Sequence, residues 1–566
     1  TWADYDPDVI SEGGGVFPRT AKSIPLSPQV RRVLGTDADA LTPAGVVRAI
    51  LSAPVDLLWN GGIGTYVKAS TETHADAGDK ANDAVRVDAA QLGARVVAEG
   101  GNLGFTQRGR VEFALGGGCI HTDAIDNSAG VDCSDHEVNI KVLLDTVVAD
   151  GELTAKQRDR LLAEMESDVA AMVLRDNYDQ TAALANALAQ SGSMVDVHAR
   201  YLRRLEADGK LDRALEFLPS DEVLAQRRSN GAGLVAPEFA VLLAYTKIDV
   251  AAQLLASDVA EDPWLGRELT AYFPPQLAGE AFADAMRRHP LRREIVAARV
   301  TNRLVDRAGT SFVYRLGEET GAGVPDLARA HAAAREIFSL EETWAAIETL
   351  DNEVEAATQR AMVLAPRRLA ERGTRWLLRH RPAPLDVAGA IAELATGVAA
   401  VADLLPGLLS TADGAALAAA AGSWEEDGVP SDLAARVAAL RFLSPALDLV
   451  DIAGRLDRPV ADVGVVHFCL GERLEFDWLS ARVEALPRDD RWQALARAAL
   501  RDDWSTLRAN LTAEVLAAGC TVDEWIAEHR SAAERFLLVL DDIRAVSNPD
   551  LATLSVAVRE ARALAS

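Results

Sequence analysis

The spacing of hydrophobic and polar positions changes once along this chain, near residue 150. Before that point, apolar residues come in short runs that end on glycine. Val55–Trp59 leads into Asn60-Gly61-Gly62, and Ala94–Ala98 leads into Glu99-Gly100-Gly101-Asn102. Such runs are too short for helices and are typical of buried strands. Beyond residue 150, apolar positions recur at helical spacing and strand signals are rare. The pattern predicts an α/β part followed by a large all-α part.

The first 150 residues repeat the order strand, glycine turn and helix. Thr42-Pro43 predicts the start of a helix that runs to Ser52, because threonine caps helices and proline is favoured at the first helical position. Residues 67–92 predict a loop that runs into a helix, and a second short apolar segment occupies 110–115. Asp135-His136-Glu137 predicts the start of a long helix that ends at Asp150-Gly151. We therefore expect residues 1–150 to form part of a doubly wound, Rossmann-like sheet, in which ligands bind outside the carboxyl ends of the strands.

Residues 151–566 predict a helical C-terminal domain with a division into two subdomains near 310–325. Thr154-Ala-Lys-Gln157 is a capping box that starts its first helix, which continues through Val173. Alanine, the strongest helix former, dominates this part of the chain. Further helices are predicted at 182–190, 193–208, 238–257, 278–287, 291–308, 325–362, 366–379, 385–404, 430–443, 476–485, 490–512, 522–545 and 548–564.

Charge and composition restrict the classes of partner. The 566 residues carry a formal net charge of -27 at pH 7, which repels phosphate backbones and anionic lipid, so we expect neither nucleic acid nor membrane partners. The apolar region 387–421 is interrupted by Glu393, Asp403 and Asp413, so no spanning segment is predicted. The four cysteines form no CxxC pair and no zinc spacing, which predicts reduced thiols in a cytoplasmic protein.

The segment Glu99–Asn102, followed by DNSAGVDCSDHE at 126–137, resembles the end of the nucleotide domain of glutamate dehydrogenases. It is most similar to the large bacterial NAD-dependent enzymes, whose chains are much longer than those of the hexameric type. Asn127 and Ser134 are seven residues apart, as in the family. Similar segments occur at 11–18 and 56–66 and, less clearly, at 289–293 and 302–309. The first 141 residues match specifically, and the rest matches as a long helical tail.

The resemblance implies oxidative deamination of L-glutamate to 2-oxoglutarate and ammonia, with hydride transfer to NAD. It implies that Ser134 binds a carboxylate of the substrate. It assigns cofactor binding to the two turns and to one asparagine beyond them, namely Asn60, Gly61, Gly62, Gly100, Gly101, Asn102 and Asn127. It also implies a cytoplasmic homo-oligomer, a tetramer by analogy with the family.

The family's catalytic lysine, its proton-transferring acid and its glycine fingerprint lie before the matched region. The contexts of Lys68 and Lys80 do not match that lysine, so we expect no catalytic residue in this chain. The chain begins at Thr1, partway through a recognisable domain. We therefore expect it to be a fragment of a longer polypeptide.

Each motif also has a plainer interpretation. Asn102 and Asn127 are common turn residues, and Ser134 could cap a helix. The acids and histidines of 121–137 do not have the spacing of an EF-hand, and Asp135 and Glu137 suit a helix N-terminus, so we expect no metal there. Gly231–Ala236 fits the pattern GxGxxA, but a charged, helix-like segment precedes it, and we expect no dinucleotide site. The arginines between 292 and 307 are expected to pair with acids of neighbouring helices.

Two alternative functions remain open from the sequence. The chain could be a helical interaction or scaffolding protein that retains a Rossmann remnant, which the missing fingerprint and lysine favour. It could also be a dehydrogenase of another amino acid, because only Ser134 argues for glutamate.

Overall fold

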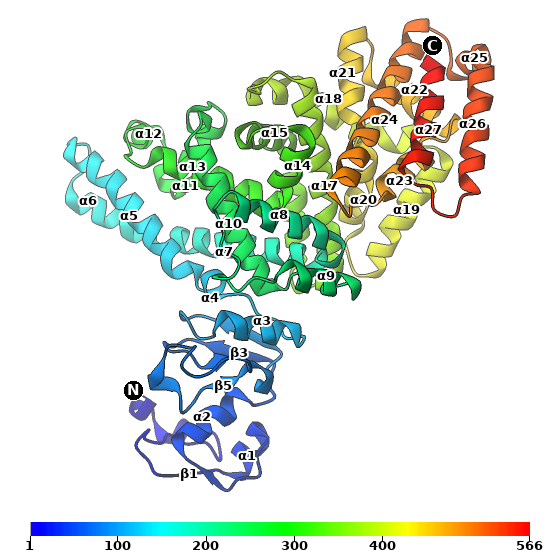
Figure 1. Cartoon of the computed structure of the whole chain (residues 1–566). Helices are drawn as coiled ribbons and strands as arrows, with labels where there is room; N and C mark the ends of the chain where they lie inside the picture. The colour runs from blue at the N-terminus through cyan, green and yellow to red at the C-terminus, as the bar shows by residue number, and fades with distance from the viewer. Residues whose placement is uncertain (1, 566) are drawn as a thin grey trace. The chain divides into compact units, whose positions relative to one another are not determined.

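The computed structural model describes residues 2–565 (Figure 1). Contacts within the chain divide it into two compact units. Unit 1 comprises Thr1–Asp249 and Leu269–Ile295, and unit 2 comprises Val250–Glu268 and Val296–Ser566. The boundaries fall within helices α10 (Ala236–Leu255) and α13 (Arg292–Ala308). The functional boundary expected at residue 150 stays a prediction.

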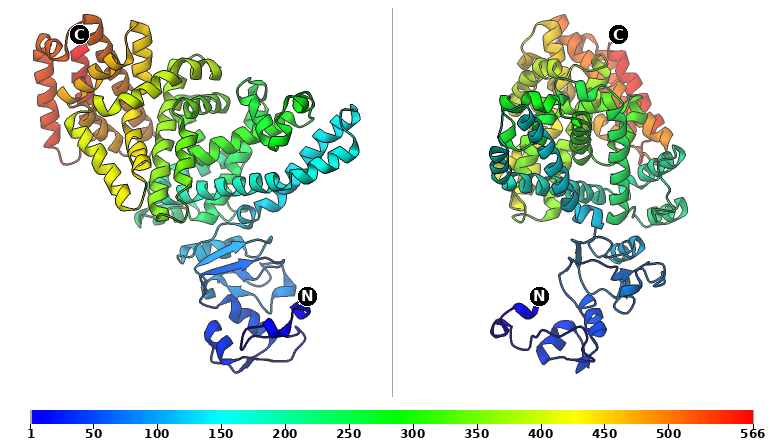
Figure 2. Two further views of the ribbon diagram at one scale, coloured as in Figure 1. Left: turned by 180° about the vertical axis from the view of Figure 1, so that it is seen from behind. Right: turned by 90° about the vertical axis from the view of Figure 1, so that its left-hand side faces the viewer.

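All strands of the described chain lie before residue 100, in the blue part of the ribbon, and everything from green to red in Figures 1 and 2 is helical or loop. The elements up to residue 149 are β1 (Ile24–Pro25), α1 (Pro28–Leu34), β2 (Ala40–Leu41), α2 (Pro43–Leu51), β3 (Leu57–Asn60), β4 (Val67–Lys68), β5 (Val87–Asp88), β6 (Val96–Glu99), α3 (Gln107–Leu115), α4 (Asp123–Asp126) and α5 (Ser128–Ala149).

Three two-stranded sheets form, and two of them are parallel. β3 pairs with β6 and β4 pairs with β5 in parallel, whereas β1 and β2 are antiparallel. The two predicted strands are thus confirmed as β3 and β6, within two residues at each end. The Rossmann-like character seen among residues 2–565 is limited to these short parallel pairs. The dominant feature is the large helical part, as predicted.

Only one face of the β3–β6 pair is covered. Val97 is buried, with Leu58 packed beside it, in a small core that includes Val67, Phe105 and Phe113. Side chains alternate across a strand, so the next residues face the other way. On that face Leu57, Trp59 and Val96 are 55%, 66% and 40% exposed. This half of the sheet therefore has an apolar face without a covering layer.

The remaining helices of unit 1 are α6 (Ala155–Glu164), α7 (Glu166–Ala189), α8 (Val195–Ala207), α9 (Asp221–Ser229), α11 (Glu268–Tyr272, which begins at the last residue of unit 2's first segment) and α12 (Glu280–Arg287). Two of them, α6 and α9, begin at side-chain caps, which Thr154 and Ser220 supply. The Thr154–Gln157 capping box is present at the start of α6. The helix predicted to continue through Val173 instead breaks at Met165, which is 1% exposed.

Unit 2 is built around α15 (Val324–Ile337). Its small side chains Ala330, Ala333 and Ala334 are fully buried, and α17 packs closely against it, where Gly373 faces Phe338 and Ala334. The other helices are α14 (Phe312–Thr320), α16 (Leu340–Glu348), α17 (Ala356–His380), α18 (Val387–Leu408), α19 (Thr411–Glu426), α20 (Ser431–Ala439), α21 (Ala446–Leu456), α22 (Val460–Arg473), α23 (Phe476–Ala485), α24 (Arg491–Ala518), α25 (Val522–Glu528), α26 (Arg530–Arg544) and α27 (Leu551–Arg562).

Several helix predictions need correction. The single helix predicted at 325–362 is three helices, α15, α16 and the first part of α17, because Ser339 adopts a left-handed conformation and residues 349–355 form turns. The segment 110–115 lies in helix α3, not in an extended strand. Residues 67–92 hold β4, β5 and two single turns of 3-10 helix, because strands of two residues leave no periodic signal.

α18 is the one helix within residues 2–565 that is long and apolar enough to cross a membrane by length and composition. It packs against α15, α21 and α22. Leu394, Val398 and Val401 are buried on one side, whereas Glu393 and Asp403 are exposed on the other. We interpret α18 as an amphipathic core helix.

Candidate functional site

Two glycine turns lie side by side at the carboxyl ends of β3 and β6. The strands pair with Asn60 next to Glu99, so the turns that follow them emerge at the same edge. The backbone N–H of Gly101 donates to the carbonyl oxygen of Asn60 at 3.0 Å and joins the two turns. The predicted positions Asn60–Gly62 and Gly100–Asn102 are therefore brought together, at the edge where open parallel sheets bind ligands.

The glycines of these turns serve different purposes. A Cβ atom on Gly101 would lie 2.4 Å from the carbonyl oxygen of Gly62, and a Cβ atom on Gly104 would lie 1.7 Å from Nδ2 of Asn60. Those two positions need glycine for the turns to pack. At Gly62 a Cβ atom would meet nothing within 4 Å. Gly62 therefore leaves open space in which a ligand can approach the backbone.

Three asparagines bring amide groups to the same edge. Nδ2 of Asn127 donates to Oδ1 of Asn102 at 3.0 Å, so two residues that are 25 positions apart in sequence meet. Nδ2 of Asn60 is buried and has no hydrogen-bond partner among residues 2–565. A buried donor without a partner costs free energy unless a ligand or water accepts its hydrogen bond. The polar groups present therefore fit a ligand that carries hydrogen-bond acceptors.

A buried ion pair holds the second turn in place. Glu99 is fully buried and accepts two hydrogen bonds from the guanidinium of Arg110, at 2.6 and 2.9 Å, and Arg110 also contacts Asp123 at 3.1 Å. Asp123 and Asp126 accept from the backbone N–H groups of Leu103 and Glu99 at 2.7 and 3.0 Å. Burial raises the pKa of the Glu99 carboxyl, although Arg110 opposes the shift.

Arg110 was not among the residues singled out in the sequence. It lies in the segment 110–115, which the sequence marks only as a short apolar run. Its position eleven residues after a buried strand-end glutamate gives no periodic signal. Only the fold brings α3 beneath the turn.

Ser134 lies on the exposed side of α5. The helix begins at Ser128, so the predicted start at Asp135 is wrong and Ser134 is not a helix cap. Its hydroxyl donates to the carbonyl oxygen of Gly130 at 3.4 Å. Seven residues make almost two helical turns, so Ser134 and Asn127 share one face of α5 about 10 Å apart along its axis. Within residues 2–565, no hydrogen bond joins Ser134 to Asn102 or Asn127.

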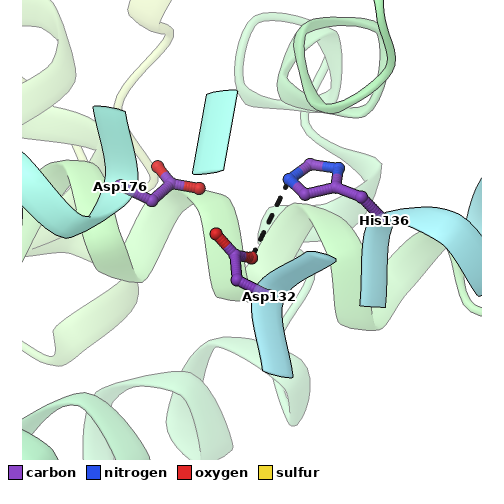
Figure 3. Close-up of side chains that lie close together, drawn as sticks. All are labelled: Asp132, His136 and Asp176. Atoms are coloured by element: carbon purple, nitrogen blue, oxygen red, sulfur yellow. Dashed lines mark ion pairs between the residues drawn. The ribbon is translucent and has the colours of Figure 1, made fainter. Parts of the chain in front are cut away.

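Two residues beyond Ser134, on another side of α5, a buried histidine lies among acids (Figure 3). His136 is 1% exposed, its Nε2 lies 3.9 Å from Asp132, and one donor atom each of Asp132, His136 and Asp176 falls within 4.8 Å of the others. The ring of His136 also stacks on Tyr272 with centroids 4.4 Å apart. Donors of these types can bind a divalent metal, but packing and ion pairing explain the same arrangement. The expectation that this region holds no metal stays a prediction.

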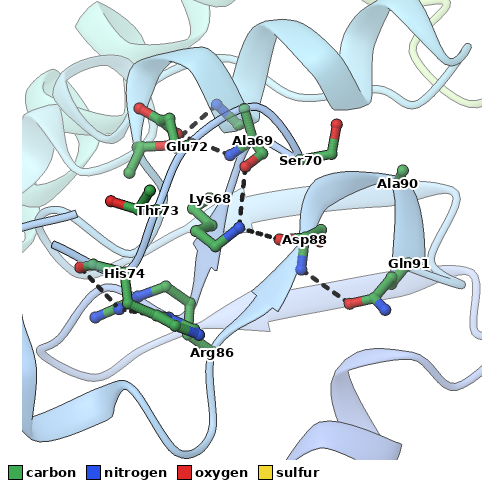
Figure 4. A network of polar contacts seen from close by, with 12 residues as sticks. Lys68, Ala69, Ser70, Glu72, Thr73, His74, Arg86, Asp88, Ala90 and Gln91 are labelled. Atoms are coloured by element: carbon green, nitrogen blue, oxygen red, sulfur yellow. Dashed lines mark hydrogen bonds and ion pairs between the residues drawn. The ribbon is translucent and has the colours of Figure 1, made fainter. Parts of the chain in front are cut away.

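Lys68 is part of a structural network (Figure 4). Its side chain is buried, forms an ion pair with Asp88 on the neighbouring strand β5 and donates to the carbonyl oxygen of Ala69 at 3.2 Å. Glu72 accepts from Thr106 at 2.5 Å and from the Ala69 N–H at 2.8 Å, which ties this loop to the start of α3. With its ammonium group held in this way, Lys68 stabilises the fold.

A cavity of about 820 Å³ opens near the amino ends of β3 and β6, where Asp56, Arg95 and Cys119 contribute to its lining. It lies at the opposite strand ends from the glycine turns. The ligand-binding edge of a parallel sheet is the carboxyl edge. We therefore do not assign the cavity to the site.

The segment Gly231–Ala236, which fits the pattern GxGxxA, follows helix α9 and not a strand, and it leads into α10, as predicted. The arginines Arg299, Arg303 and Arg307 pair with acids, also as predicted. Arg303 contacts Glu268, and Arg307 contacts Glu348 at 2.8 Å.

Paired glycine turns at the carboxyl ends of parallel strands, beside a helix that starts with polar residues, are typical of the ligand-binding edge of α/β proteins. Comparison with known proteins narrows this class. Residues 1–187 match the family described as "Bacterial NAD-glutamate dehydrogenase, catalytic domain", and residues 231–563 match "Glutamate dehydrogenase, C-terminal". The chain belongs to the bacterial NAD-glutamate dehydrogenase family.

Sequence identity to individual relatives supports membership of this family. The chain is 45% identical over its whole length to the NAD-specific glutamate dehydrogenase of Pseudomonas aeruginosa. It is 44% identical, over 99% of its length, to the enzymes of the same name from Halomonas elongata and Mycobacterium tuberculosis. In each case it covers 35% of the relative, so the chain spans about a third of the length of these proteins.

Proposed function

We propose that this chain is the C-terminal part of an NAD-dependent glutamate dehydrogenase, which converts L-glutamate to 2-oxoglutarate and ammonia. The observation that carries the proposal is the meeting of Asn102 and Asn127 beside two joined glycine turns, with Ser134 on the same face of α5. The relatives that match the whole chain bear the name NAD-specific glutamate dehydrogenase. When bound, NAD supplies the hydride acceptor of the reaction.

The residues of this chain would bind and orient the cofactor. Gly62 leaves space for the cofactor to approach the backbone, and the unpartnered Nδ2 of Asn60 is available to donate to it. Gly61, Gly100 and Gly101 shape the turns. The amides of Asn102 and Asn127 combine donors and acceptors, which suits the nicotinamide and ribose groups.

Ser134 would bind a carboxylate of glutamate. Its hydroxyl is exposed, and a hydroxyl donor suits a carboxylate acceptor. A rise of about 10 Å along α5 separates Ser134 from Asn127, which leaves room for a substrate between the cofactor and the serine.

Proton transfer would belong to residues outside this chain. Lys68 is occupied by Asp88, and Lys80 is an exposed residue of a single helical turn. In the complete protein, we propose that the parallel strands β3 and β6 form part of a larger Rossmann-like sheet whose other elements cover Leu57, Trp59 and Val96. We also propose a cytoplasmic homo-oligomer, with the helical domain contributing subunit contacts.

The test compares Ser134→Ala with Cys133→Ala in the complete protein. Cys133 is the exposed neighbour of Ser134 on α5 and points away from its face, which makes it a matched control. We expect Ser134→Ala to raise KM for glutamate about tenfold or more, because a hydrogen bond to a charged group is lost, while NAD affinity and Tm stay unchanged. Cys133→Ala should behave as the parent protein.

An unchanged KM for glutamate in Ser134→Ala would contradict the proposal that Ser134 binds the substrate. If the complete protein neither binds NAD nor oxidises glutamate, the scaffolding alternative is favoured. Oxidation of another amino acid in preference to glutamate would favour the second alternative.

A further inference from the structure

Unit 2 contains a cluster of arginines at the junction of α14, α17 and α24. Its members are Arg315, Arg367, Arg375, Arg488, Arg497 and Arg501. α14 packs against both α17 and α24, and ion pairs through Glu371 and Glu319 join Arg315, Arg375 and Arg501. Arg367 and Arg497 lie one helical turn before Glu371 and Arg501, and Arg488 lies in the loop before α24. We refer to these six residues as the arginine cluster.

The acids around the cluster already have partners. Glu371 accepts two hydrogen bonds from Arg315, at 2.9 and 2.7 Å. Glu319 pairs with Arg375 and lies 3.7 Å from Arg501. Two further acids pair with arginines outside the cluster, Glu484 with Arg372 and Asp502 with Arg379, and Asp502 also lies 3.5 Å from Arg501.

Three guanidinium groups are left over. Arg367, Arg488 and Arg497 have no acidic partner among residues 2–565, although each side chain is partly buried. Burial and neighbouring arginines lower the pKa of Arg367 and of Arg497 to about 10, and the pKa of Arg488 falls for the same reasons. All three therefore remain cationic at neutral pH. The cluster carries a local positive surplus inside a chain whose net charge is -27.

One of these groups is held in place by a glycine. Gly309 follows α13 with φ +93°, and a Cβ atom there would lie 2.0 Å from Nη2 of Arg367. The guanidinium thus lies against the backbone at a position where only glycine leaves room. Gly309 ends the segment 302–309 that the sequence singled out. The orientation of Arg367 is therefore built into the fold.

A partly buried cation without a partner destabilises a fold unless an anion compensates it. The planar guanidinium group matches the oxygens of phosphates and carboxylates in a bidentate arrangement. We propose that the arginine cluster binds a small polyanion through phosphate or carboxylate oxygens, with Arg367, Arg488 and Arg497 as its principal ligands.

The acidity of the rest of the chain restricts the ligand. Large polyanions such as nucleic acids are repelled by the net charge of -27, whereas a small ion with two or more charges can enter the local positive field. The proposal concerns a site in the helical unit and does not depend on the assignment of the glycine turns.

The experiment titrates the full chain with pyrophosphate and, separately, with tricarballylate. Isothermal titration calorimetry and Tm are compared with sodium chloride at matched ionic strength. We expect saturable binding of at least one anion and a rise in Tm beyond the chloride control, because the anion binds only the folded state. The anion that binds more tightly identifies phosphate or carboxylate as the preferred group.

Arg497→Gln and Arg367→Gln test the residues. Each should weaken binding by about tenfold or more, because a charge-assisted contact is lost. Neither should lower Tm in anion-free buffer, because each removes an unpaired cation. Arg436→Gln, at an exposed position on α20 outside the cluster, is the control and should bind as the parent chain does.

The proposal is overturned if both anions act only as chloride does, or if both cluster variants bind with the affinity of Arg436→Gln. A fall in Tm for both cluster variants without anion would also contradict it, because that result would mean that these arginines stabilise the fold through contacts within the chain.

Discussion

At the scale of single residues, the glycine turns separate positions that serve packing from a position that serves a ligand. Gly101 allows two backbone turns to touch, and Gly104 leaves room for the side chain of Asn60. Gly62 is surrounded by open space. The sequence identified Gly61, Gly62, Gly100 and Gly101 as turn residues and could not rank them, because it does not show that Gly100 and Gly101 meet Trp59 and Gly62 of the neighbouring strand and turn.

This difference predicts opposite outcomes for two alanine substitutions. Gly101→Ala should lower stability by about 1–3 kcal/mol, because its Cβ atom would meet the Gly62 carbonyl oxygen at 2.4 Å. Gly62→Ala should change stability by less than about 0.5 kcal/mol. It should nevertheless reduce NAD affinity in the complete protein, since the methyl group would occupy space left for the cofactor. Thermal unfolding and NAD titration of both variants check this, and unchanged NAD affinity in Gly62→Ala would contradict the proposed cofactor position.

At the scale of elements, the β3–β6 pair is a sheet that is covered on only one face. Its covered face holds Val97 over a small core, and the opposite face exposes Leu57, Trp59 and Val96. Parallel sheets are normally covered on both faces. The run Val55–Trp59 reads as a strand buried on both sides, and the chain by itself buries only one of them.

We therefore expect the chain to self-associate through this face. Replacing both Leu57 and Trp59 by threonine should lower the association measured by sedimentation velocity, because less apolar surface is removed from water when two copies meet. Leu538→Thr, at a 65% exposed position on α26, is the control and should leave association unchanged. If the parent chain is monodisperse at high concentration, this apolar face does not cause self-association.

At the scale of the whole molecule, a chain with a net charge of -27 holds its helical unit together partly through buried arginine–glutamate pairs. Glu371 lies between Arg315 and Arg375. Burial opposes ionisation of Glu371, but the two arginines hold the pKa of its carboxyl well below the ordinary value. Because the folded pKa is depressed, this group stabilises the fold above the ordinary carboxyl pKa of about 4.3, and that contribution is lost as pH falls further.

Glu371→Gln should therefore destabilise unit 2 at neutral pH and make its free energy of unfolding depend less on pH in acid. We expect a loss of about 3–5 kcal/mol at pH 7, because Arg315 would stay buried without a counter-charge. The difference from the parent chain should shrink as pH falls below about 4, because the Glu371 carboxyl of the unfolded parent chain then takes up a proton while the folded one stays ionised. Urea unfolding at several pH values measures this, and a pH-independent difference would mean that Glu371 acts through packing and not through its charge.

Much of the local structure could be predicted because its cause is local. Thr42 caps α2, Thr154 and Gln157 form a capping box, and the glycine after Asp150 ends α5, each through contacts within a few residues. The polar run at 126–137 identified the family for the same reason, since it is contiguous. The start of α5 was misplaced because the polar residues 128–134 carry no apolar periodicity, although they are helical in the structure.

The sequence by itself determined the α/β-then-helical order, the strand ends that carry glycine turns and the membership of the glutamate dehydrogenase family. Only the tertiary structure decided which residues meet. The contact between Asn102 and Asn127, the burial of Glu99 on Arg110 and the surplus of guanidinium groups at Arg367, Arg488 and Arg497 join positions from 11 to 130 residues apart. Spacing and capping act within a few residues along the chain, whereas ion pairing and desolvation depend on distances that exist only after the chain has folded.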